Sequence, residues 1–198
     1  MSNKDNKDLI AEAIRFAIDA HSGMTRKGSE IPYIMHPLEA MAIAAGVTGD
    51  EEVIAAAVLH DVLEDTPATS EILLSRFGAR VLSLVQSDSE NKREDLPAAD
   101  TWQTRKQETI DFLAGRAGRD EKIIALSDKL SNIRAMWADQ IKYGDKLWER
   151  FNVKDKEKHR WYYASVAEAL NDLNTTEPCP AYIEYCGLVK KVFEDTSR

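Results

Sequence analysis

The chain has 198 residues, 43% of them hydrophobic, which is enough for one substantial core and predicts a single domain over 1–198. Its formal net charge of −8 repels nucleic acid and anionic lipid, so we expect neither a nucleic-acid nor a membrane partner. No run approaches the roughly 20 apolar residues of a membrane-spanning helix, and the polar start Met1–Asp5 has no apolar signal region behind it, so we expect a cytoplasmic protein.

Apolar residues recur at spacings of three and four through the first half of the chain, which predicts helices and no sheet. Glycines and Pro32 interrupt the pattern between Gly23 and Met35, so this stretch is expected to be a loop. Asp50 and Thr69 are suited to N-cap positions, and Gly78 to a helix end. The helix that Asp50 caps has the face Val53, Ile54, Ala57, Val58 and Asp61, and the other predicted helices lie at about Asn6–His21, Pro37–Ala45, Ser70–Phe77 and Val81–Val85.

The second half begins with a polar and charged segment, Gln86–Asp100, which predicts a mobile loop suited to serve as a lid. Helical periodicity then resumes and completes an all-α bundle. A Gly-rich phosphate loop is absent from the sequence, which excludes a P-loop nucleotide-binding protein. The predicted helices are Trp102–Arg116, Glu121–Trp137, Asp155–Leu173 and Pro180–Phe193.

A histidine and an aspartate stand side by side, His60 and Asp61, on a helix that is otherwise aliphatic. Ionised carboxylates are rarely buried in such surroundings unless a metal or a cation partners them. Imidazole nitrogen and carboxylate oxygen are suitable ligands for Mn²⁺, Fe²⁺ or Zn²⁺. An isolated histidine next to an aspartate is, however, more often a local hydrogen bond or a helix-end feature than a metal site.

Two further residues favour the metal. His36 precedes Pro37 at a helix start, and Asp128 interrupts the apolar stripe of its own helix. Two imidazoles and two carboxylates from three helices make a sensible set of ligands that leaves room for water or a substrate oxygen. Asp128 taken alone is equally consistent with a solvated helix residue or a partner of Arg134.

Acidic and basic residues flank the predicted ligands. Glu64 follows His60 by one helical turn and projects from the same face, so it can handle the proton of an attacking water; the alternative is solvation of a helix end. Cationic groups around a metal in an acidic protein favour a polyphosphate pocket. The cationic groups are Arg26 and Lys27 before His36, and Lys129 and Arg134 after Asp128, with the neutral amide of Asn132 between the last two.

These residues resemble a known family. The order His36, His60-Asp61, Asp128 resembles the HD superfamily of metal-dependent phosphohydrolases, whose fold is an all-helical bundle. The resemblance narrows to the hydrolase domain of RelA/SpoT proteins and the stand-alone small alarmone hydrolases, over about 8–173, with the last helix (180–193) beyond it. It rests on Arg26-Lys27, Pro32–Pro37, Leu59–Thr66 and Ser127–Arg134.

The resemblance implies hydrolysis of the 3′-pyrophosphate of guanosine tetra- or pentaphosphate, which gives GDP or GTP and pyrophosphate. It implies one divalent ion, Mn²⁺ in most members, with Fe²⁺ or Zn²⁺ as alternatives. By position, the metal ligands are His36, His60, Asp61 and Asp128. Glu64 and Asp65 correspond to the catalytic carboxylates. The substrate contacts correspond to Arg26, Lys27, Tyr33, Lys129 and Asn132.

The chain departs from the family pattern at Ser87–Lys92, where the family has a threonine followed by an aspartate-lysine pair. This departure leaves two other functions open: an HD phosphatase or pyrophosphohydrolase of another nucleotide, such as a reduced nicotinamide cofactor phosphate, and a non-catalytic nucleotide sensor. A complete metal set together with Glu64 and Asp65 speaks against the sensor, which needs no such combination. A homo-oligomer is also left open.

Overall fold

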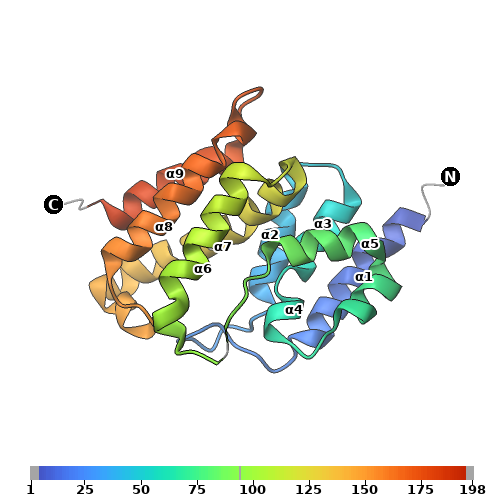
Figure 1. Ribbon diagram of the computed structural model, residues 1–198, viewed down its shortest axis with the longest axis horizontal. Helices are drawn as coiled ribbons and strands as arrows, with labels where there is room; N and C mark the ends of the chain where they lie inside the picture. The colour runs from blue at the N-terminus through green and yellow to red at the C-terminus, as the bar shows by residue number, and fades with distance from the viewer. Residues whose placement is uncertain (1–4, 94, 195–198) are drawn as a thin grey trace. The chain divides into compact units, whose positions relative to one another are not determined.

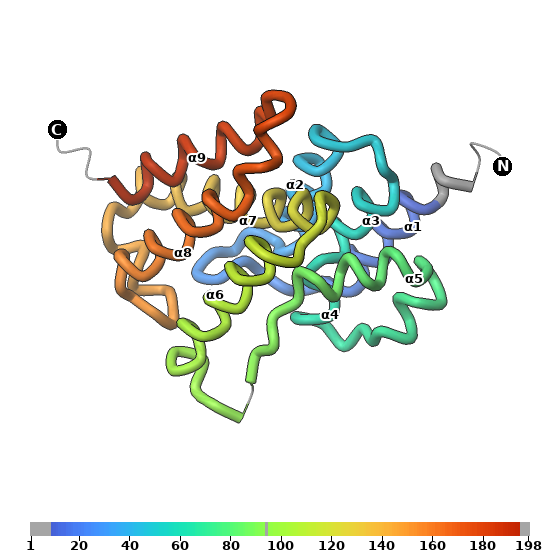
Figure 2. The backbone as a smooth tube through the Cα atoms, turned by 45° about the horizontal axis from the view of Figure 1, so that its top comes forward, coloured from blue at the N-terminus to red at the C-terminus, as the bar shows by residue number. Residues whose placement is uncertain are grey.

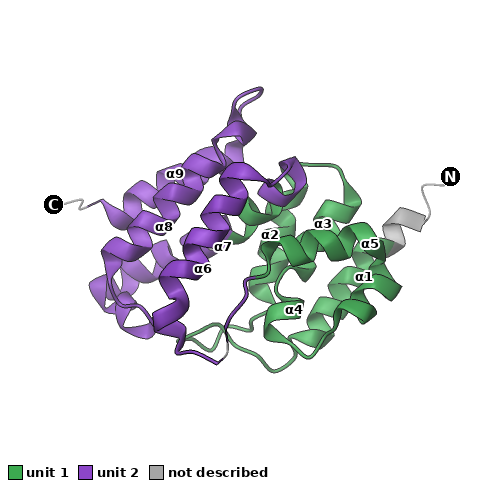
Figure 3. Ribbon diagram, viewed as in Figure 1, with its two compact units in different colours: residues 1–89, 123–128 green, residues 90–122, 129–198 purple. Residues whose placement is uncertain are grey.

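A computed structural model of the protein describes residues 5–93 and 95–194, and its regular structure is helical (Figure 1). Over these ranges, β-type pairing is limited to a single antiparallel bridge between Thr25 and Pro32. The all-α class predicted from the sequence is therefore confirmed. The chain divides into two compact units, Met1–Ser89 with Ile123–Asp128, and Glu90–Lys122 with Lys129–Arg198 (Figure 3). The single domain stays a prediction.

The first unit is built around helix α3, whose residues Val53–Leu59 are all buried. A helix that is apolar on every side belongs in the interior, and α3 accordingly packs against α1, α2 and α5. Figure 2 traces these segments from blue to green. The unit's helices are α1 (Asp5–Ala20), α2 (Met35–Ala45), α3 (Glu51–Leu59), α4 (Val62–Asp65) and α5 (Ser70–Asp88).

Side chains predicted to cap the helices of the first unit do so. Asp50 accepts hydrogen bonds from the backbone N–H groups of Glu52 (3.0 Å) and Val53, and Thr69 caps α5. The Arg80 guanidinium donates to both carboxylate oxygens of Asp50, at 3.0 and 2.9 Å, which joins the start of α3 to α5. Gly78, at φ 84°, interrupts the helical backbone within α5, so the predicted break is present as a kink.

Helix α8 is the centre of the second unit and packs against α6 and α9. Buried His159 donates a hydrogen bond from Nε2 to the Val153 carbonyl (2.7 Å), and the rings of Trp102, Trp148 and Phe151 surround it. The unit's helices are α6 (Ala98–Gly115), the 3₁₀ helix η1 (Gly144–Arg150), α8 (Lys156–Ala169), the 3₁₀ helix η2 (Asn171–Asn174) and α9 (Pro180–Phe193). Helix α7 (Arg119–Tyr143) contributes to both units.

Helix ends differ from the prediction mainly around the polar segment. Helix α5 continues to Asp88 and α6 already begins at Ala98, so the expected loop Gln86–Asp100 is shorter than its composition indicates. Its mobility and its use as a lid stay predictions. None of the helices in the described ranges has the length and apolar character needed to cross a membrane.

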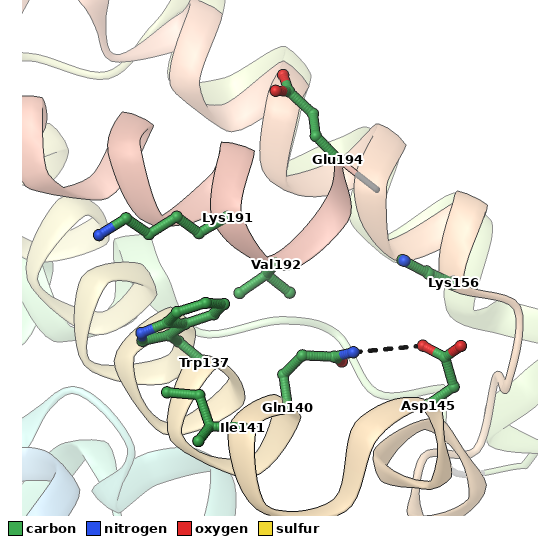
Figure 4. Close-up of a pocket in the computed structure, with 8 residues that line it drawn as sticks. All are labelled: Trp137, Gln140, Ile141, Asp145, Lys156, Lys191, Val192 and Glu194. Atoms are coloured by element: carbon green, nitrogen blue, oxygen red, sulfur yellow. Dashed lines mark hydrogen bonds between the residues drawn. The ribbon is translucent and has the colours of Figure 1, made fainter. Parts of the chain in front are cut away.

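A pocket of about 260 Å³ lies in the second unit (Figure 4). The Gln140 amide in its wall donates to Asp145 (3.4 Å), and the Lys191 ammonium lies 5.8 Å from the centre of the Trp137 ring. The residues that line it include no histidine and no pair of neighbouring carboxylates. Its chemistry therefore does not point to a metal site or to acid–base catalysis.

Candidate metal centre

The four predicted metal ligands all belong to the first unit. His36 lies in the first turn of α2, which begins two residues earlier than the sequence predicts, and Asp128 lies on α7. His60 and Asp61 occupy the junction where α3 ends and α4 begins. His36, His60 and Asp128 are buried, and 13% of the Asp61 side chain is exposed. Helices α2 and α7 and the junction between α3 and α4 therefore bring every predicted ligand to the interior of one unit.

The ligand atoms converge on a common point. The two histidine Nε2 atoms lie 3.2 Å apart, and the ligand atoms of His36, His60 and Asp128 lie within 4.8 Å of one another. Asp61 Oδ2 is 3.4 Å from His36 Nε2 and 3.1 Å from His60 Nε2. Two ligands about 2.1 Å from one ion, at angles of about 90–110°, are about 3.0–3.4 Å apart. Most of these separations match that geometry.

The chemistry of the donors also fits a cation. His60 Nδ1 lies 2.8 Å from the Ala57 carbonyl, which can only accept, so Nδ1 carries the proton and Nε2 of the neutral ring presents a lone pair to the cluster. That lone pair faces a second imidazole nitrogen and carboxylate oxygens. A bound cation would accept these lone pairs and so reduce the repulsion between them. The hydrogen bond to Ala57 fixes the tautomer of His60 that can bind a cation.

Electrostatics at the centre favour positive charge. Burial lowers the pKa of His60, but Asp61 and Asp128 outweigh it and raise that pKa well above its usual value. Burial likewise raises the pKa of Asp61, but His60 and His36 outweigh it and hold that pKa well below its usual range. Asp61 therefore stays ionised here and requires either protonated imidazoles or a cation.

The two predicted catalytic carboxylates follow directly on the chain. Glu64 and Asp65 are half-buried on α4, and their backbone N–H groups donate to the Asp61 carbonyl at 3.2 and 2.9 Å. Asp65 also accepts a hydrogen bond from the Tyr33 hydroxyl (2.9 Å). Both residues are thus held within one helical turn of a predicted metal ligand.

Tyr33 contacts the predicted metal ligands directly. Its hydroxyl donates to Asp61 Oδ2 at 2.7 Å as well as to Asp65. Burial, followed by the charges of Asp61 and Asp65, raises the pKa of Tyr33 far above its usual value, so the phenol keeps its proton. The sequence predicted a substrate contact at this position, whereas the hydroxyl faces carboxylates.

The predicted cationic substrate contacts are distributed over both units. In the first unit, the Arg26 guanidinium lies 5.7 Å from the centre of the Tyr33 ring, and Lys27 is exposed. Lys129 is buried and Asn132 half-buried in the part of α7 that belongs to the second unit. Contact of these four residues with a substrate stays a prediction.

His21 is a residue that the sequence analysis did not select. It is 2% exposed at the end of α1, and its ring centre lies 4.9 Å from that of Tyr33. Neither ring nitrogen has a hydrogen-bond partner. Burial lowers its pKa, while Asp61 and Asp65 act in the opposite direction. The available signal was a histidine that ends an apolar helical stripe, as Asp61 does on α3.

The helical fold, with one candidate divalent-metal cluster among the residues that the structure describes, is that of a metal-dependent phosphohydrolase. The model of the HD domain family matches residues 13–149, and the chain belongs to this family. The resemblance inferred from the sequence motifs is thereby confirmed.

Among curated proteins, the chain is 36% identical over 135 residues to the guanosine-3′,5′-bis(diphosphate) 3′-pyrophosphohydrolase MESH1 of Danio rerio, which covers 67% of this chain and 71% of that protein. It is also 36% identical over 166 residues to a guanosine-3′,5′-bis(diphosphate) 3′-pyrophosphohydrolase of Aquifex aeolicus (strain VF5), covering 82% of this chain. There the match spans only 23% of the relative.

Two solved structures share the fold. A metazoan ortholog of SpoT, described as hydrolysing ppGpp, superposes with a TM-score of 0.71 at 25% identity, over 92% of this chain and 94% of that one. A protein of Listeria monocytogenes EGD-e superposes with a TM-score of 0.70 at 32% identity, over 80% of this chain and 98% of that one.

Proposed function

We propose that this protein hydrolyses the 3′-pyrophosphate of guanosine tetra- or pentaphosphate and releases GDP or GTP and pyrophosphate. The observation that carries the proposal is the convergence of His36, His60, Asp61 and Asp128 in one buried cluster, in a chain whose relatives are named for this reaction. A divalent ion held by these residues supplies positive charge and Lewis acidity beside a phosphoryl group.

The reaction needs one proton to be removed from water and one to be delivered to the 3′ oxygen of the ribose. Glu64 and Asp65 are the groups suited to these transfers, because both are tied to the backbone of Asp61. Asp65 is further oriented by the Tyr33 hydroxyl, whereas Glu64 follows Asp61 by three residues on the same short helix. We assign proton handling to this pair.

Substrate binding requires positive charge in a protein whose formal net charge is −8. We propose that Arg26, Lys27, Lys129 and Asn132 contact the nucleotide, since guanidinium and ammonium groups match phosphate oxygens. Arg26 is already ordered against the Tyr33 ring. This order reduces the conformational entropy lost when a substrate binds.

We infer that the ion in use is Mn²⁺, with Fe²⁺ and Zn²⁺ as the alternatives, because a mixed set of imidazoles and carboxylates accepts all three. We further propose a cytoplasmic protein, and its acidic composition supports the prediction of no nucleic-acid or membrane partner. Sedimentation of the metal-loaded protein would show whether it forms a homo-oligomer.

A screen of nucleotides tests the proposal. Metal-free protein is reloaded with Mn²⁺, Fe²⁺ or Zn²⁺ and incubated with guanosine tetraphosphate, GTP and reduced nicotinamide adenine dinucleotide phosphate, and the products are separated by ion-exchange chromatography. We expect GDP and pyrophosphate from guanosine tetraphosphate with Mn²⁺. Tight binding of this nucleotide without turnover would support the sensor instead.

A second candidate function is hydrolysis of another phosphorylated nucleotide. It is favoured by the departure from the family pattern at Ser87–Lys92, where Glu90 forms ion pairs with Arg105 and Lys106 at 2.7 and 2.5 Å. Two cations engaged in this way are less available to a phosphate. Orthophosphate released from the nicotinamide cofactor, with guanosine tetraphosphate left intact, would support this candidate.

A further inference from the structure

One oxygen atom connects Tyr33 to the metal centre. The Tyr33 hydroxyl lies 2.7 Å from Asp61 Oδ2, and this same oxygen faces His36 Nε2 at 3.4 Å and His60 Nε2 at 3.1 Å. The hydroxyl therefore contacts the carboxylate oxygen that is turned toward the other predicted ligands. A group that donates to a ligating carboxylate fixes its orientation and adjusts its basicity.

The same hydroxyl also reaches Asp65 Oδ2 at 2.9 Å. A phenol has one proton, so the hydroxyl directs it to one carboxylate at a time or divides it between the two, and its oxygen lies 2.7 Å from Asp61 and 2.9 Å from Asp65. One of these carboxylates is a predicted metal ligand and the other a predicted catalytic group. Tyr33 thus joins the two halves of the reaction centre.

The backbone around Tyr33 is fixed. The Tyr33 N–H donates to the Met24 carbonyl (2.9 Å), and the Arg26 N–H donates to the Ile31 carbonyl (2.8 Å), which closes the loop before α2 into a narrow turn. The His36 N–H then donates to the Tyr33 carbonyl (3.0 Å). Tyr33 and the ligand His36 are consequently held in one rigid stretch of chain.

The ring of Tyr33 is fixed as well. Its centre lies 4.9 Å from that of His21 and 6.1 Å from that of His36, and the Arg26 guanidinium lies 5.7 Å away. His21 is buried and neither of its nitrogens is hydrogen bonded, so packing against the phenol ring is its contribution to this part of the unit. With the ring held by these neighbours, the hydroxyl has one direction available.

We infer that Tyr33 is a positioning residue, which sets Asp61 for the metal and Asp65 for proton transfer, and not a residue that binds the nucleotide. The inference rests on the proposed function for the meaning of Asp65, but its metal half stands on the geometry of the cluster. A substrate contact and a positioning residue differ in what the loss of the hydroxyl changes. The first raises KM, and the second weakens metal binding and lowers kcat.

Tyr33→Phe is the test, because it removes the hydroxyl and keeps the ring that packs against His21 and Arg26. Titration calorimetry of the metal-free protein with MnCl₂ should show an affinity about 10–100-fold weaker than that of the wild type. With Mn²⁺ at saturation, kcat for guanosine tetraphosphate should fall while KM changes by less than about threefold. Circular dichroism verifies the fold.

Tyr182→Phe is the matched control. Its hydroxyl donates to the Ala167 carbonyl (2.9 Å) in the second unit, so the variant loses a phenolic hydrogen bond without touching the metal cluster. Mn²⁺ affinity and kcat should both remain at the wild-type values. Unchanged Mn²⁺ affinity in Tyr33→Phe together with a raised KM would overturn the inference and restore the substrate contact.

A double-mutant cycle with Asp65→Asn gives a second measurement that does not depend on one variant. If the phenol acts through Asp65, the effects of Tyr33→Phe and Asp65→Asn on kcat should be less than additive. Fully additive effects would contradict the inference that the Tyr33 hydroxyl acts through Asp65. Should the wild type bind Mn²⁺ and turn over no guanosine nucleotide, the proposed function fails while the calorimetric comparison still decides the role of Tyr33.

Discussion

Two clusters of charged side chains, one in each unit, are both largely buried and differ in how their charges are balanced. In the second unit, Glu90 is 12% exposed and each of its carboxylate oxygens has a cationic partner, Arg105 on one side and Lys106 on the other. The Lys106 ammonium also lies 4.8 Å from the centre of the Tyr162 ring. The only carboxylate among these three side chains is thus paired with permanently charged groups of the chain itself.

The cluster in the first unit is not balanced in this way. His60 donates through Nδ1 to the Ala57 carbonyl. Its other ring nitrogen, Nε2, faces the side chains of Asp61, Asp128 and His36. The four side chains of this cluster include two carboxylates and no permanently charged cation, so their positive charge comes from protonated imidazoles or from a bound ion. A buried cluster of carboxylates thus points to a cationic ligand when its own side chains include no permanent cation, and to stability when they do.

Removing a metal ligand should have the largest effect. Asp61→Ala takes away the carboxylate that lies 3.1 Å from His60 Nε2, so we expect loss of Mn²⁺ binding and a fall in pyrophosphate release of about 10³-fold or more. Activity assays and metal titration measure the two effects. Asp145→Ala, at an exposed aspartate of η1, should keep wild-type activity. Wild-type turnover in Asp61→Ala would remove this residue from the centre.

Removing a catalytic carboxylate should leave the centre assembled. Glu64→Gln keeps the size of the side chain and its place on α4, so Mn²⁺ and substrate should bind as before. We expect kcat to fall by about 10²–10⁴-fold, the usual contribution of a positioned acid or base. Single-turnover assays at saturating substrate measure this step, and an unchanged rate would take Glu64 out of the reaction.

Disrupting the balanced cluster should change stability and not metal binding. Glu90→Gln removes the charge shared by Arg105 and Lys106 and leaves two cations beside each other in a largely buried site. We expect the free energy of unfolding to fall by about 3 kcal/mol, as for other broken buried ion pairs. Urea unfolding of the metal-free protein measures the loss. A weaker Mn²⁺ affinity in this variant would contradict the separation of the two clusters.

The pH dependence of the stability difference between wild type and Glu90→Gln gives a second test of these ion pairs. Burial raises the pKa of Glu90, but Lys106, Lys129 and Arg105 outweigh it and hold the pKa below the ordinary value of 4.5. A carboxyl group with a lower pKa when folded stabilises the protein above its unfolded pKa, and this contribution is lost as pH falls through the folded pKa. The stability difference between wild type and Glu90→Gln should therefore be complete above pH 4.5 and shrink below it.

An exposed ion pair should show the smallest effect. Arg134 donates to both carboxylate oxygens of Glu184 at 2.7 Å, but the two side chains are 35% and 43% exposed. Glu184→Gln should change the free energy of unfolding by no more than about 1 kcal/mol and leave activity unaltered. The same urea and activity assays apply, and a loss comparable to that of Glu90→Gln would show that burial is not what separates them.

Local chemistry made much of the fold predictable from the sequence. Asp50 and Thr69 cap the helices they were expected to cap, because a short side-chain acceptor before an apolar run has few other uses. The proposed metal ligands His60 and Asp61 could be selected for a related reason, since they follow directly on a run of residues that is buried throughout. Composition and spacing contain this information without any knowledge of the tertiary structure.

Contacts between distant segments were not predictable in the same way. The bond from Tyr33 to Asp61 joins residues 28 positions apart, and no periodic pattern specifies it. His21 was placed on an apolar helix face, yet its environment is set by the loop that follows. The 3₁₀ helix Gly144–Arg150 was missed because a short tight helix has no amphipathic repeat.

The backbone of Asp61 has a consequence for how such an enzyme can diversify. Its carbonyl accepts hydrogen bonds from the N–H groups of both Glu64 and Asp65, so one turn of main chain sets the spacing between a proposed metal ligand and the proposed proton-transfer groups. The surrounding loops can then change in length or in sequence while Glu64 and Asp65 keep their positions relative to Asp61. Natural selection or engineering can therefore change the residues that select the nucleotide while the residues proposed to carry out the cleavage stay the same.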